Sequence, residues 1–237
     1  MKDYSEFSDD KVISFSRAVT TPMVTKPAMR PSIYSKIGKR SLDIVITLSA
    51  MVFLSPLILF CLAATAIDGK APIFGHRRVG VNGREFKCWK IRSMVADAET
   101  RLQAYLDQNP EAQKEWNATR KLSYDPRITR FGQFIRKTSI DELPQLWNVL
   151  IGEMSIVGPR PVVKDELDQM YARGLGRSSY LEMRPGITGL WQVSGRNQAS
   201  YDDRVAYDIE YRQEYSLKKD LQIIVKTFGA VINRTGM

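Results

Sequence analysis

Residues 44–67 read IVITLSAMVFLSPLILFCLAATAI, and this uncharged run of 24 residues decides the fold. As a straight helix it would extend roughly 36 Å, which exceeds the ~30 Å hydrocarbon core of a bilayer. A run this long rarely lies inside the core of so small a domain. The sequence therefore predicts a membrane helix rather than a buried core helix.

The pair Ser55-Pro56 stands near the middle of this run. Proline removes a backbone donor and clashes with the carbonyl four residues earlier, so we expect a break that leaves two halves too short to span. Basic residues flank both ends, which gives the positive-inside rule no preferred direction. The pattern favours a re-entrant helix with both ends in the cytoplasm. The alternative, a kinked spanning helix, would put everything after Asp68 outside the cell, away from nucleotides.

Composition narrows the chemistry. Lys and Arg number 35 against 26 Asp and Glu, a net charge of +9, which favours anionic partners such as nucleic acid, lipid headgroups or phosphate-bearing substrates. The single histidine, His76, excludes a multi-histidine metal centre. The two cysteines form no CxxC motif and suit a reducing compartment.

Four segments are predicted along the chain. Residues 1–31 read as a disordered tail, 32–70 as the re-entrant helix with its flanks, 71–215 as a cytoplasmic catalytic domain, and 216–237 as an amphipathic helix. In the last segment, apolar residues recur at helical spacing with lysines between them, which is typical of a helix on a headgroup surface. Packing of that helix on the soluble core is an equal alternative.

The catalytic segment predicts an α+β fold that is mainly helical. Residues 73–94 suggest short strands around the turn Val81-Asn82-Gly83, and residues 95–122 suggest two helices interrupted at Asn109-Pro110. No long run of strand character indicates a large sheet. The expected architecture is a monotopic membrane protein with a small catalytic domain and surface amphipathic helices.

The stretch Thr138–Leu150 carries the candidate chemistry. Its apolar residues Leu143, Leu146, Trp147 and Leu150 fall on one face of a helix. Because Pro144 is tolerated only in a first helical turn, the helix should begin near Ile140 or Asp141. Asp141 and Glu142 would then lie at the positive end of the helix dipole. Acidic residues there are often only structural caps.

Arginines in rigid turns shift the balance toward a phosphate site. Arg136 lies just before the acidic pair, and three Gly/Pro-rich loops follow at 158–161, 184–189 and 194–197. Arginine binds phosphate oxygens in a planar fork, and a rigid turn lowers the entropic cost of holding it. Together the loops suggest a diphosphate site. The predicted substrate-binding residues are Arg136, Pro159, Arg160, Pro161, Arg184 and Arg196.

The string from Thr129 to Val162, TRFGQFIRKTSIDELPQLWNVLIGEMSIVGPRPV, resembles the signature of the bacterial sugar transferase family, the small monotopic polyprenyl-phosphate phosphoglycosyl transferases. The resemblance extends over 37–232 and includes FKCWKIRSM (86–94) and RPGITGLWQVSGRN (184–197). The segment 109–122 is similar to the ExoY-type members, which transfer galactose-1-phosphate in exopolysaccharide synthesis.

The resemblance implies an enzyme that moves hexose-1-phosphate from a UDP-sugar to undecaprenyl phosphate and releases UMP. Galactose is favoured and glucose is possible. Asp141 would be the nucleophile that forms an aspartyl-phosphosugar intermediate, and Glu142, with Asp141, would hold Mg²⁺. Arg160 and Arg196 would contact the nucleotide and its phosphates.

The resemblance also implies a membrane position. Ser55 and Pro56 would break the re-entrant helix, and Lys39 and Arg40 would lie at the membrane interface. The protein would act at the cytoplasmic face of the bacterial inner membrane, in contact with its lipid and not with nucleic acid. Two rival readings are a membrane-anchored module that binds anionic lipid or nucleic acid, and a Mg²⁺-dependent hydrolase of lipid diphosphates.

Overall fold

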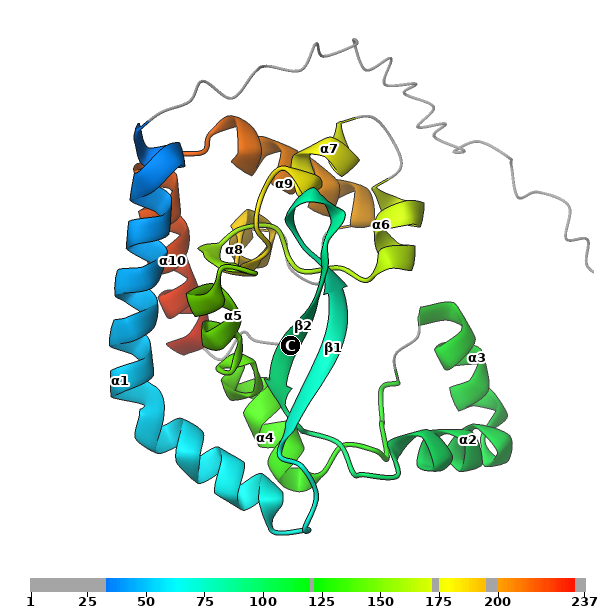
Figure 1. Cartoon of the computed structure of the whole chain (residues 1–237). Coiled ribbons are helices and arrows are strands. Elements are labelled where there is room, and N and C mark those ends of the chain that lie inside the picture. The colour runs from blue at the N-terminus through cyan, green and yellow to red at the C-terminus, as the bar shows by residue number, and fades with distance from the viewer. Residues whose placement is uncertain (1–32, 120–121, 172–174, 195–199, 233–237) are drawn as a thin grey trace, which may run out of the picture.

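The computed structural model describes residues 33–119, 122–171, 175–194 and 200–232 (Figure 1). The predicted tail at 1–31 lies outside these ranges. The described chain is a mixture of helices with two short sheets. The helices are α1 Lys39–Ala66, α2 Ala98–Gln108, α3 Pro110–Thr119, α4 Arg130–Lys137, α5 Gln145–Ile151, α6 Lys164–Met170, α7 Gly176–Leu181, α8 Leu190–Ser194, α9 Tyr201–Gln213 and α10 Leu217–Ile232.

Helix α1 contains the apolar run and continues through Pro56 instead of ending there. The carbonyl that Pro56 leaves without its usual amide partner is that of Val52, and the Ser55 hydroxyl donates to it at 2.9 Å. The helix changes direction near its middle (Figure 1). The predicted break is therefore a bend, because the serine hydroxyl takes the place of the missing N–H.

Most of the apolar surface of α1 is free of protein contacts. Only 11% of its most apolar stretch is buried, and Val52, Phe53, Leu59 and Phe60 are exposed. By length and composition the helix is long enough to cross a membrane. An exposed apolar face of this size is expected of a helix that contacts lipid, and it rules out the buried core helix.

Polar contacts fix the N-terminal half of α1 to the rest of the protein. Asp43 is fully buried and accepts from the Ser155 hydroxyl at 2.9 Å and the Ile156 amide at 3.0 Å. The Lys39 Nζ lies 2.8 Å from the Asp220 Oδ2 on α10. A buried ion pair without one partner would leave an uncompensated charge, so these contacts hold α1 in one register.

The other end of α1 is attached to the same body. Arg92 donates to the Thr65 carbonyl at 3.1 Å and to the Asp68 carboxylate at 2.6 Å. Both ends of the helix therefore contact a single folded unit.

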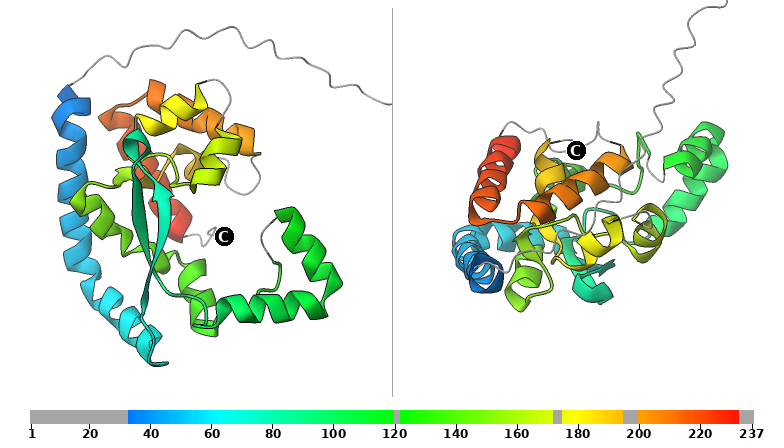
Figure 2. Two further views of the ribbon diagram at one scale, coloured as in Figure 1. Left: turned by 45° about the vertical axis from the view of Figure 1, so that its right-hand side comes forward. Right: turned by 90° about the horizontal axis from the view of Figure 1, so that it is seen from above.

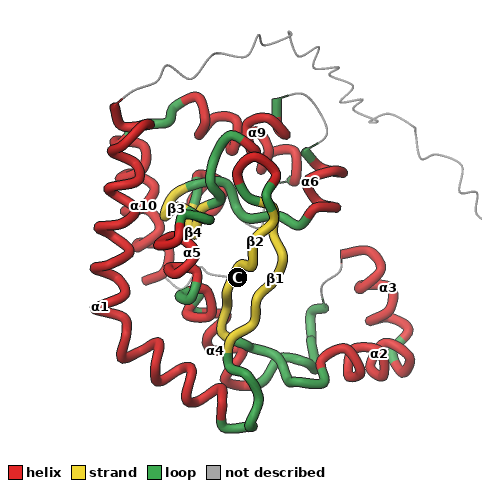
Figure 3. The backbone as a smooth tube through the Cα atoms, viewed as in Figure 1, coloured by secondary structure: helices red, strands yellow, loops and turns green. Residues whose placement is uncertain are grey.

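The two sheets are short, as expected (Figure 3). Strands β1 Ile73–Val79 and β2 Glu85–Ile91 form an antiparallel hairpin whose turn contains Asn82 at φ 58°. Strands β3 Ser155–Val157 and β4 Gly186–Thr188 are parallel. A Cβ at Gly186 would stand 2.1 Å from the backbone nitrogen of Gly158, so the close approach of these two loops requires glycine.

The core lies between the hairpin, α5, the second sheet and the C-terminal helices. It includes Phe86 and Cys88 of β2, Val149 of α5, Tyr211 of α9 and Ile223 of α10. The expected apolar face of α5 is partly wrong: Leu146 is buried, but Trp147 is 51% exposed and Val149 takes the buried position. The helix is short, and its contacts with α1 and β2 decide which residues are covered.

Helix α10 packs one face on the core and leaves an apolar face exposed, so it has features of both expected arrangements, core packing and contact with a headgroup surface. Ile223 and Asp220 are buried against the core, whereas Leu221, Val225 and Phe228 form an exposed apolar face. In Figure 1, α10 lies beside α1. The exposed apolar faces of these two helices are the described surfaces best suited to lipid.

Helices α2 and α3 form the predicted helical pair and project from the body as an arm (Figure 2). They pack mainly against each other.

Candidate active site

The acidic pair lies in a single 3-10 turn, Ile140–Glu142, placed ahead of α5. Pro144 has no N–H to donate to the carbonyl of Ile140, which accepts from the Leu143 amide at 3.1 Å instead. The α-helix therefore begins at Gln145, later than expected. The turn follows Ser139, which has a left-handed φ of 57°. Such a conformation in a residue other than glycine costs of the order of 1–3 kcal/mol and is frequent at functional sites.

Lys90 of β2 contacts both carboxylates. Its Nζ lies 2.6 Å from the Glu142 Oε1 and 3.9 Å from the Asp141 Oδ2. Phe86, Cys88 and Lys90 alternate along β2 and share one face of the strand, and the first two residues are in the core. Lys90 therefore lies at the end of β2 that leaves the core and reaches the acidic turn.

The two carboxylates have opposite pKa shifts. Asp141 is only 7% exposed, and burial together with the neighbouring Glu142 charge raises its pKa to about 6, against the opposing effect of Lys90 and Arg136. Burial would also raise the pKa of Glu142, but Lys90, Arg160 and Arg78 lower it by more. Glu142 is therefore a fixed anion, and Asp141 is an anion that its surroundings stabilise poorly.

Three arginines from different elements complete the cluster. Arg136 ends α4, and its Nε donates to the Ser93 hydroxyl at 2.9 Å. Arg160 belongs to the loop after β3, and Arg78 belongs to β1. The Arg136 charge lowers the pKa of Asp141, and the Arg160 and Arg78 charges lower the pKa of Glu142, so each arginine lies near enough to favour the ionised form of one carboxylate. Such a cation group around two carboxylates is suited to bind a diphosphate.

The structure brings together most of the predicted site residues. Asp141, Glu142, Arg136 and Arg160 meet here, and Pro159 and Pro161 flank Arg160 in its loop. Arg184 lies elsewhere: its side chain is exposed, and its Nε donates to the Gly152 carbonyl at 2.9 Å. Arg196 lies outside the described residues.

The two residues predicted at the membrane interface make protein contacts. Lys39 is buried in its pairing with Asp220, and Arg40 donates to the carbonyls of Val149 and Leu150 at 2.6 and 2.8 Å. Those carbonyls end α5, where a cation also complements the helix dipole. Both residues hold α1 against the catalytic domain.

Two residues of the cluster, Lys90 and Arg78, were not predicted from the sequence. Lys90 lies within the motif at 86–94, and Arg78 is one of the basic residues that follow the apolar run. The available signal was the alternation of β1 and β2, because Arg78 pairs with Phe86 and points to the same face as Lys90.

Asp141 and Glu142 fit the way in which Mg²⁺ usually binds at phosphate-transfer sites. Among the residues that the structure describes, no group of three or more His, Cys, Asp or Glu side chains is arranged for a metal ion. In phosphate-transfer sites Mg²⁺ takes one or two carboxylates and completes its octahedron with substrate phosphates and water. Asp141 and Glu142 suit this mode and not a cage of protein ligands.

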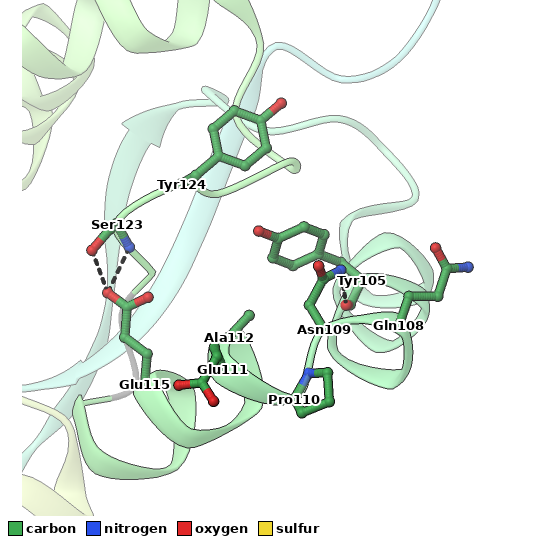
Figure 4. A pocket seen from close by; sticks show the side chains of 9 residues that line it. All are labelled: Tyr105, Gln108, Asn109, Pro110, Glu111, Ala112, Glu115, Ser123 and Tyr124. Carbon is green, nitrogen blue, oxygen red and sulfur yellow. Dashed lines mark hydrogen bonds between the residues drawn. The ribbon is translucent and has the colours of Figure 1, made fainter.

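A separate cleft of about 520 Å³ lies at the arm between α2, α3 and residues 123–124 (Figure 4). It is lined by Tyr105, Asn109, Tyr124 and their neighbours. No member of the acidic pair or of the cation cluster lines it, so it is not part of the candidate active site.

The chain is similar to known proteins over nearly all of the described residues. Residues 34–234 match the family described as bacterial sugar transferase. The chain is 50% identical over 205 residues to the exopolysaccharide production protein ExoY of Sinorhizobium fredii, which covers 86% of this chain and 88% of that protein. The chain belongs to the bacterial sugar transferase family.

Two further relatives are longer. The chain is 47% identical over 230 residues to a UDP-galactose-lipid carrier transferase of Erwinia amylovora, covering 97% of this chain and 47% of the relative. It is 47% identical over 202 residues to an undecaprenyl-phosphate galactose phosphotransferase of Salmonella typhimurium, which covers 85% of this chain and 42% of that protein. The chain thus spans about half the length of these two proteins.

Proposed function

We propose that this protein transfers hexose-1-phosphate from a UDP-sugar to undecaprenyl phosphate and releases UMP. The observation that carries the proposal is the burial of Asp141 beside Glu142 within a group of four cations, Lys90, Arg78, Arg136 and Arg160. Phosphoryl transfer needs charge neutralisation and in-line placement more than acid–base groups, and the four cations supply the charge neutralisation.

The reaction proceeds in two displacements at one phosphorus atom. A carboxylate oxygen of Asp141 forms a bond to the β-phosphorus, and the bond from that phosphorus to the bridging oxygen breaks, so UMP leaves with the electron pair. A phosphate oxygen of undecaprenyl phosphate then attacks the aspartyl-phosphosugar, and the Asp141 carboxylate leaves. The product is undecaprenyl diphosphate hexose, and the enzyme is regenerated.

Each described residue of the cluster has a part in this scheme. Burial leaves the Asp141 carboxylate poorly solvated and so more reactive as a nucleophile, while Lys90 keeps enough positive charge nearby to hold it ionised near neutral pH. The arginines bind the diphosphate oxygens of the donor. Mg²⁺, held by Glu142 and Asp141, would neutralise charge on the diphosphate when bound.

The membrane part of the proposal rests on the contacts of α1. Its N-terminal half binds the catalytic domain through Lys39, Arg40 and Asp43, and Arg92 holds its C-terminal end to the same domain. These contacts support a re-entrant helix that enters and leaves the cytoplasmic face of the inner membrane. The bend at Ser55-Pro56 would form its tip.

Galactose is the favoured sugar because the names of the Erwinia and Salmonella relatives specify it. Glucose remains the second candidate, since both sugars carry the same diphosphate and differ at one hydroxyl group. Synthesis of exopolysaccharide is the process suggested by the name of the Sinorhizobium relative.

The test is release of UMP from UDP-galactose and UDP-glucose by the detergent-solubilised full chain. It is run with and without undecaprenyl phosphate and Mg²⁺. We expect sustained UMP release only with the lipid and the metal, and loss of turnover in Asp141→Asn. Asp107→Asn, a change to an exposed carboxylate on α2, is the matched control and should leave the rate unchanged.

Two outcomes would contradict the proposal. UMP release that continues without the lipid would indicate a hydrolase that uses water as acceptor. Normal turnover by Asp141→Asn would remove Asp141 as the nucleophile, whichever sugar is used.

A further inference from the structure

Arg204, in the first turn of α9, lies directly behind the loop that carries Arg160. It is only 7% exposed. Its Nη2 donates to the backbone carbonyl of Arg160 at 3.3 Å, and its Nη1 donates to the Glu166 Oε1 at 2.8 Å. The rings of Trp191 and Tyr201 lie 5.1 and 5.0 Å from its Cζ. The guanidinium is therefore fixed by two hydrogen bonds and two aromatic contacts.

Glu166 extends these contacts to a second cation of the site. Its Oε1 also accepts a hydrogen bond from the Tyr201 hydroxyl, and its Oε2 lies 3.8 Å from the Nη1 of Arg78. The carboxylate thus lies between Arg204 and Arg78. Burial and the Arg160 charge both lower the pKa of Arg78, and each of the two arginines lowers the pKa of Glu142, as expected of two neighbouring cations.

We propose that Arg204 is a positioning residue of the donor site, which fixes the Arg160 loop through its carbonyl and orients Arg78 through Glu166. The inference rests on the proposed function and adds to it the residue that sets the affinity for the uridine diphosphate part of the donor. The contacts of Arg204 are with the Arg160 loop, Glu166 and two aromatic rings. It acts on the candidate site through Arg160 and Arg78.

The geometry requires arginine in particular. The planar fork of a guanidinium presents two donors in fixed directions, one for Glu166 and one for the Arg160 carbonyl. A lysine offers a single ammonium on a flexible stem and cannot hold both acceptors in that arrangement. Arg204→Lys therefore keeps the positive charge and most of the side-chain volume. It loses the hydrogen bond to Glu166 or the one to the Arg160 carbonyl, so either Arg78 or Arg160 is no longer held in place.

Helix α9 supplies a matched control. Arg212, in its last turn, is 5% exposed and donates through its Nε to the Glu182 Oε2 at 2.8 Å. Arg204 and Arg212 are thus two buried arginines of one helix, each paired with a glutamate. Only Arg204 contacts the Arg160 loop.

The experiment measures binding of UDP and of UDP-galactose, with Mg²⁺, to the detergent-solubilised full chain by titrated thermal shift. This readout does not need turnover. We expect Arg204→Lys to weaken binding at least about 10-fold and Arg212→Lys to change it less than about threefold, although both lower the unliganded Tm similarly. In the UMP assay, Arg204→Lys should raise KM for the UDP-sugar and leave KM for undecaprenyl phosphate unchanged.

A double-mutant cycle tests the route of the effect. In a background that carries both Arg78→Ala and Arg160→Ala, the further weakening caused by Arg204→Lys should fall below about threefold, since both side chains that Arg204 positions are already absent. Independent, multiplying losses would overturn the inference.

The remaining outcomes are equally decisive. Equal weakening in Arg204→Lys and Arg212→Lys would make Arg204 merely structural and overturn the inference while the proposed function stands. If neither UDP nor UDP-galactose binds the wild-type protein, the proposed function and the inference are both wrong.

Discussion

At the scale of single residues, Asp141 has the most demanding environment of the candidate site. Burial and the adjacent Glu142 disfavour its charge, and Lys90 and Arg136 favour it. Its pKa of about 6 leaves the carboxylate mostly ionised at neutral pH, but less strongly stabilised than an exposed aspartate. A nucleophile benefits from this state, since it has less solvation to lose when it attacks.

The activity should therefore depend on pH in the mildly acidic range. We expect kcat/KM for the UDP-sugar to rise as pH increases through about 6, because the deprotonated Asp141 is the reactive form. Lys90→Met should move this transition to higher pH and lower kcat/KM at pH 7 by about 10- to 100-fold, since Lys90 lowers the pKa and pairs with Glu142.

Lys87→Met is the control for that profile. Lys87 is also on β2, but its side chain is on the opposite face of the strand from Lys90 and lies near the Trp89 ring. Its removal should leave the profile unchanged. An identical acid limb in wild type and Lys90→Met would contradict the assignment of that limb to Asp141.

Asp141 should also destabilise the fold at neutral pH. The folded-state pKa exceeds the ordinary value of 3.8, so the folded protein binds the proton more tightly than the unfolded chain. The stability from that proton is present at low pH and is lost as pH rises through about 6, a loss of roughly 3 kcal/mol. Asp141→Asn should raise the Tm by several degrees at pH 7.5, and this gain should shrink toward pH 5. A lower Tm for Asp141→Asn at pH 7.5 would be evidence against this cost.

At the scale of elements, the contact between α1 and α5 joins the long apolar helix to the candidate active site. Arg40 of α1 binds the last carbonyls of α5, and α5 follows directly on the acidic turn. The position of α1 therefore helps to fix the helix that follows Asp141.

Arg40→Ala tests this connection. Loss of two charge-assisted hydrogen bonds should lower the free energy of unfolding by about 2–3 kcal/mol and reduce kcat, although Arg40 contacts no residue of the acidic pair. Arg101→Ala on α2, whose partner is the exposed Asp97, should change neither quantity. Thermal unfolding and UMP release would be compared for both variants. Equal kcat values for Arg40→Ala and wild type would show that the contact between α1 and α5 does not affect the active site.

Elements with local causes were predicted well from the sequence. The hairpin followed from its Asn-Gly turn, and the helical pair followed from Asn109-Pro110. The burial of Lys39 was not predicted, because its partner Asp220 lies far along the chain. A lysine beside an apolar run looks like a headgroup contact until the distant carboxylate is known.

At the scale of the whole molecule, the position of both ends of α1 determines its topology. A re-entrant helix should leave Ser41 and Lys70, both exposed, on the same side of the membrane. We expect Ser41→Cys and Lys70→Cys to react with a membrane-impermeant maleimide only after the cells are permeabilised. Cys61 and Cys88 are buried, so the wild-type protein serves as the background control. Labelling of Lys70→Cys in intact cells would identify a spanning helix.

Only part of the candidate site was predicted from the sequence, because some of its residues lie far apart along the chain. Asp141, Glu142, Arg136 and Arg160 fall within a short stretch of sequence, whereas Arg78, Glu166 and Arg204 join them only through the fold of β1, α6 and α9. Contacts between distant segments leave no periodic signal in one sequence. The buried guanidinium of Arg204 is the clearest case.

The arm formed by α2 and α3 has a practical consequence for imaging. Since these helices pack mainly against each other and project from the body, a rigid helical protein fused at the Asn109-Pro110 turn would extend away from the rest of the body (Figure 2). A chain of 27.0 kDa offers few landmarks for particle alignment in electron cryomicroscopy. The arm supplies a natural mounting point for such a fiducial marker.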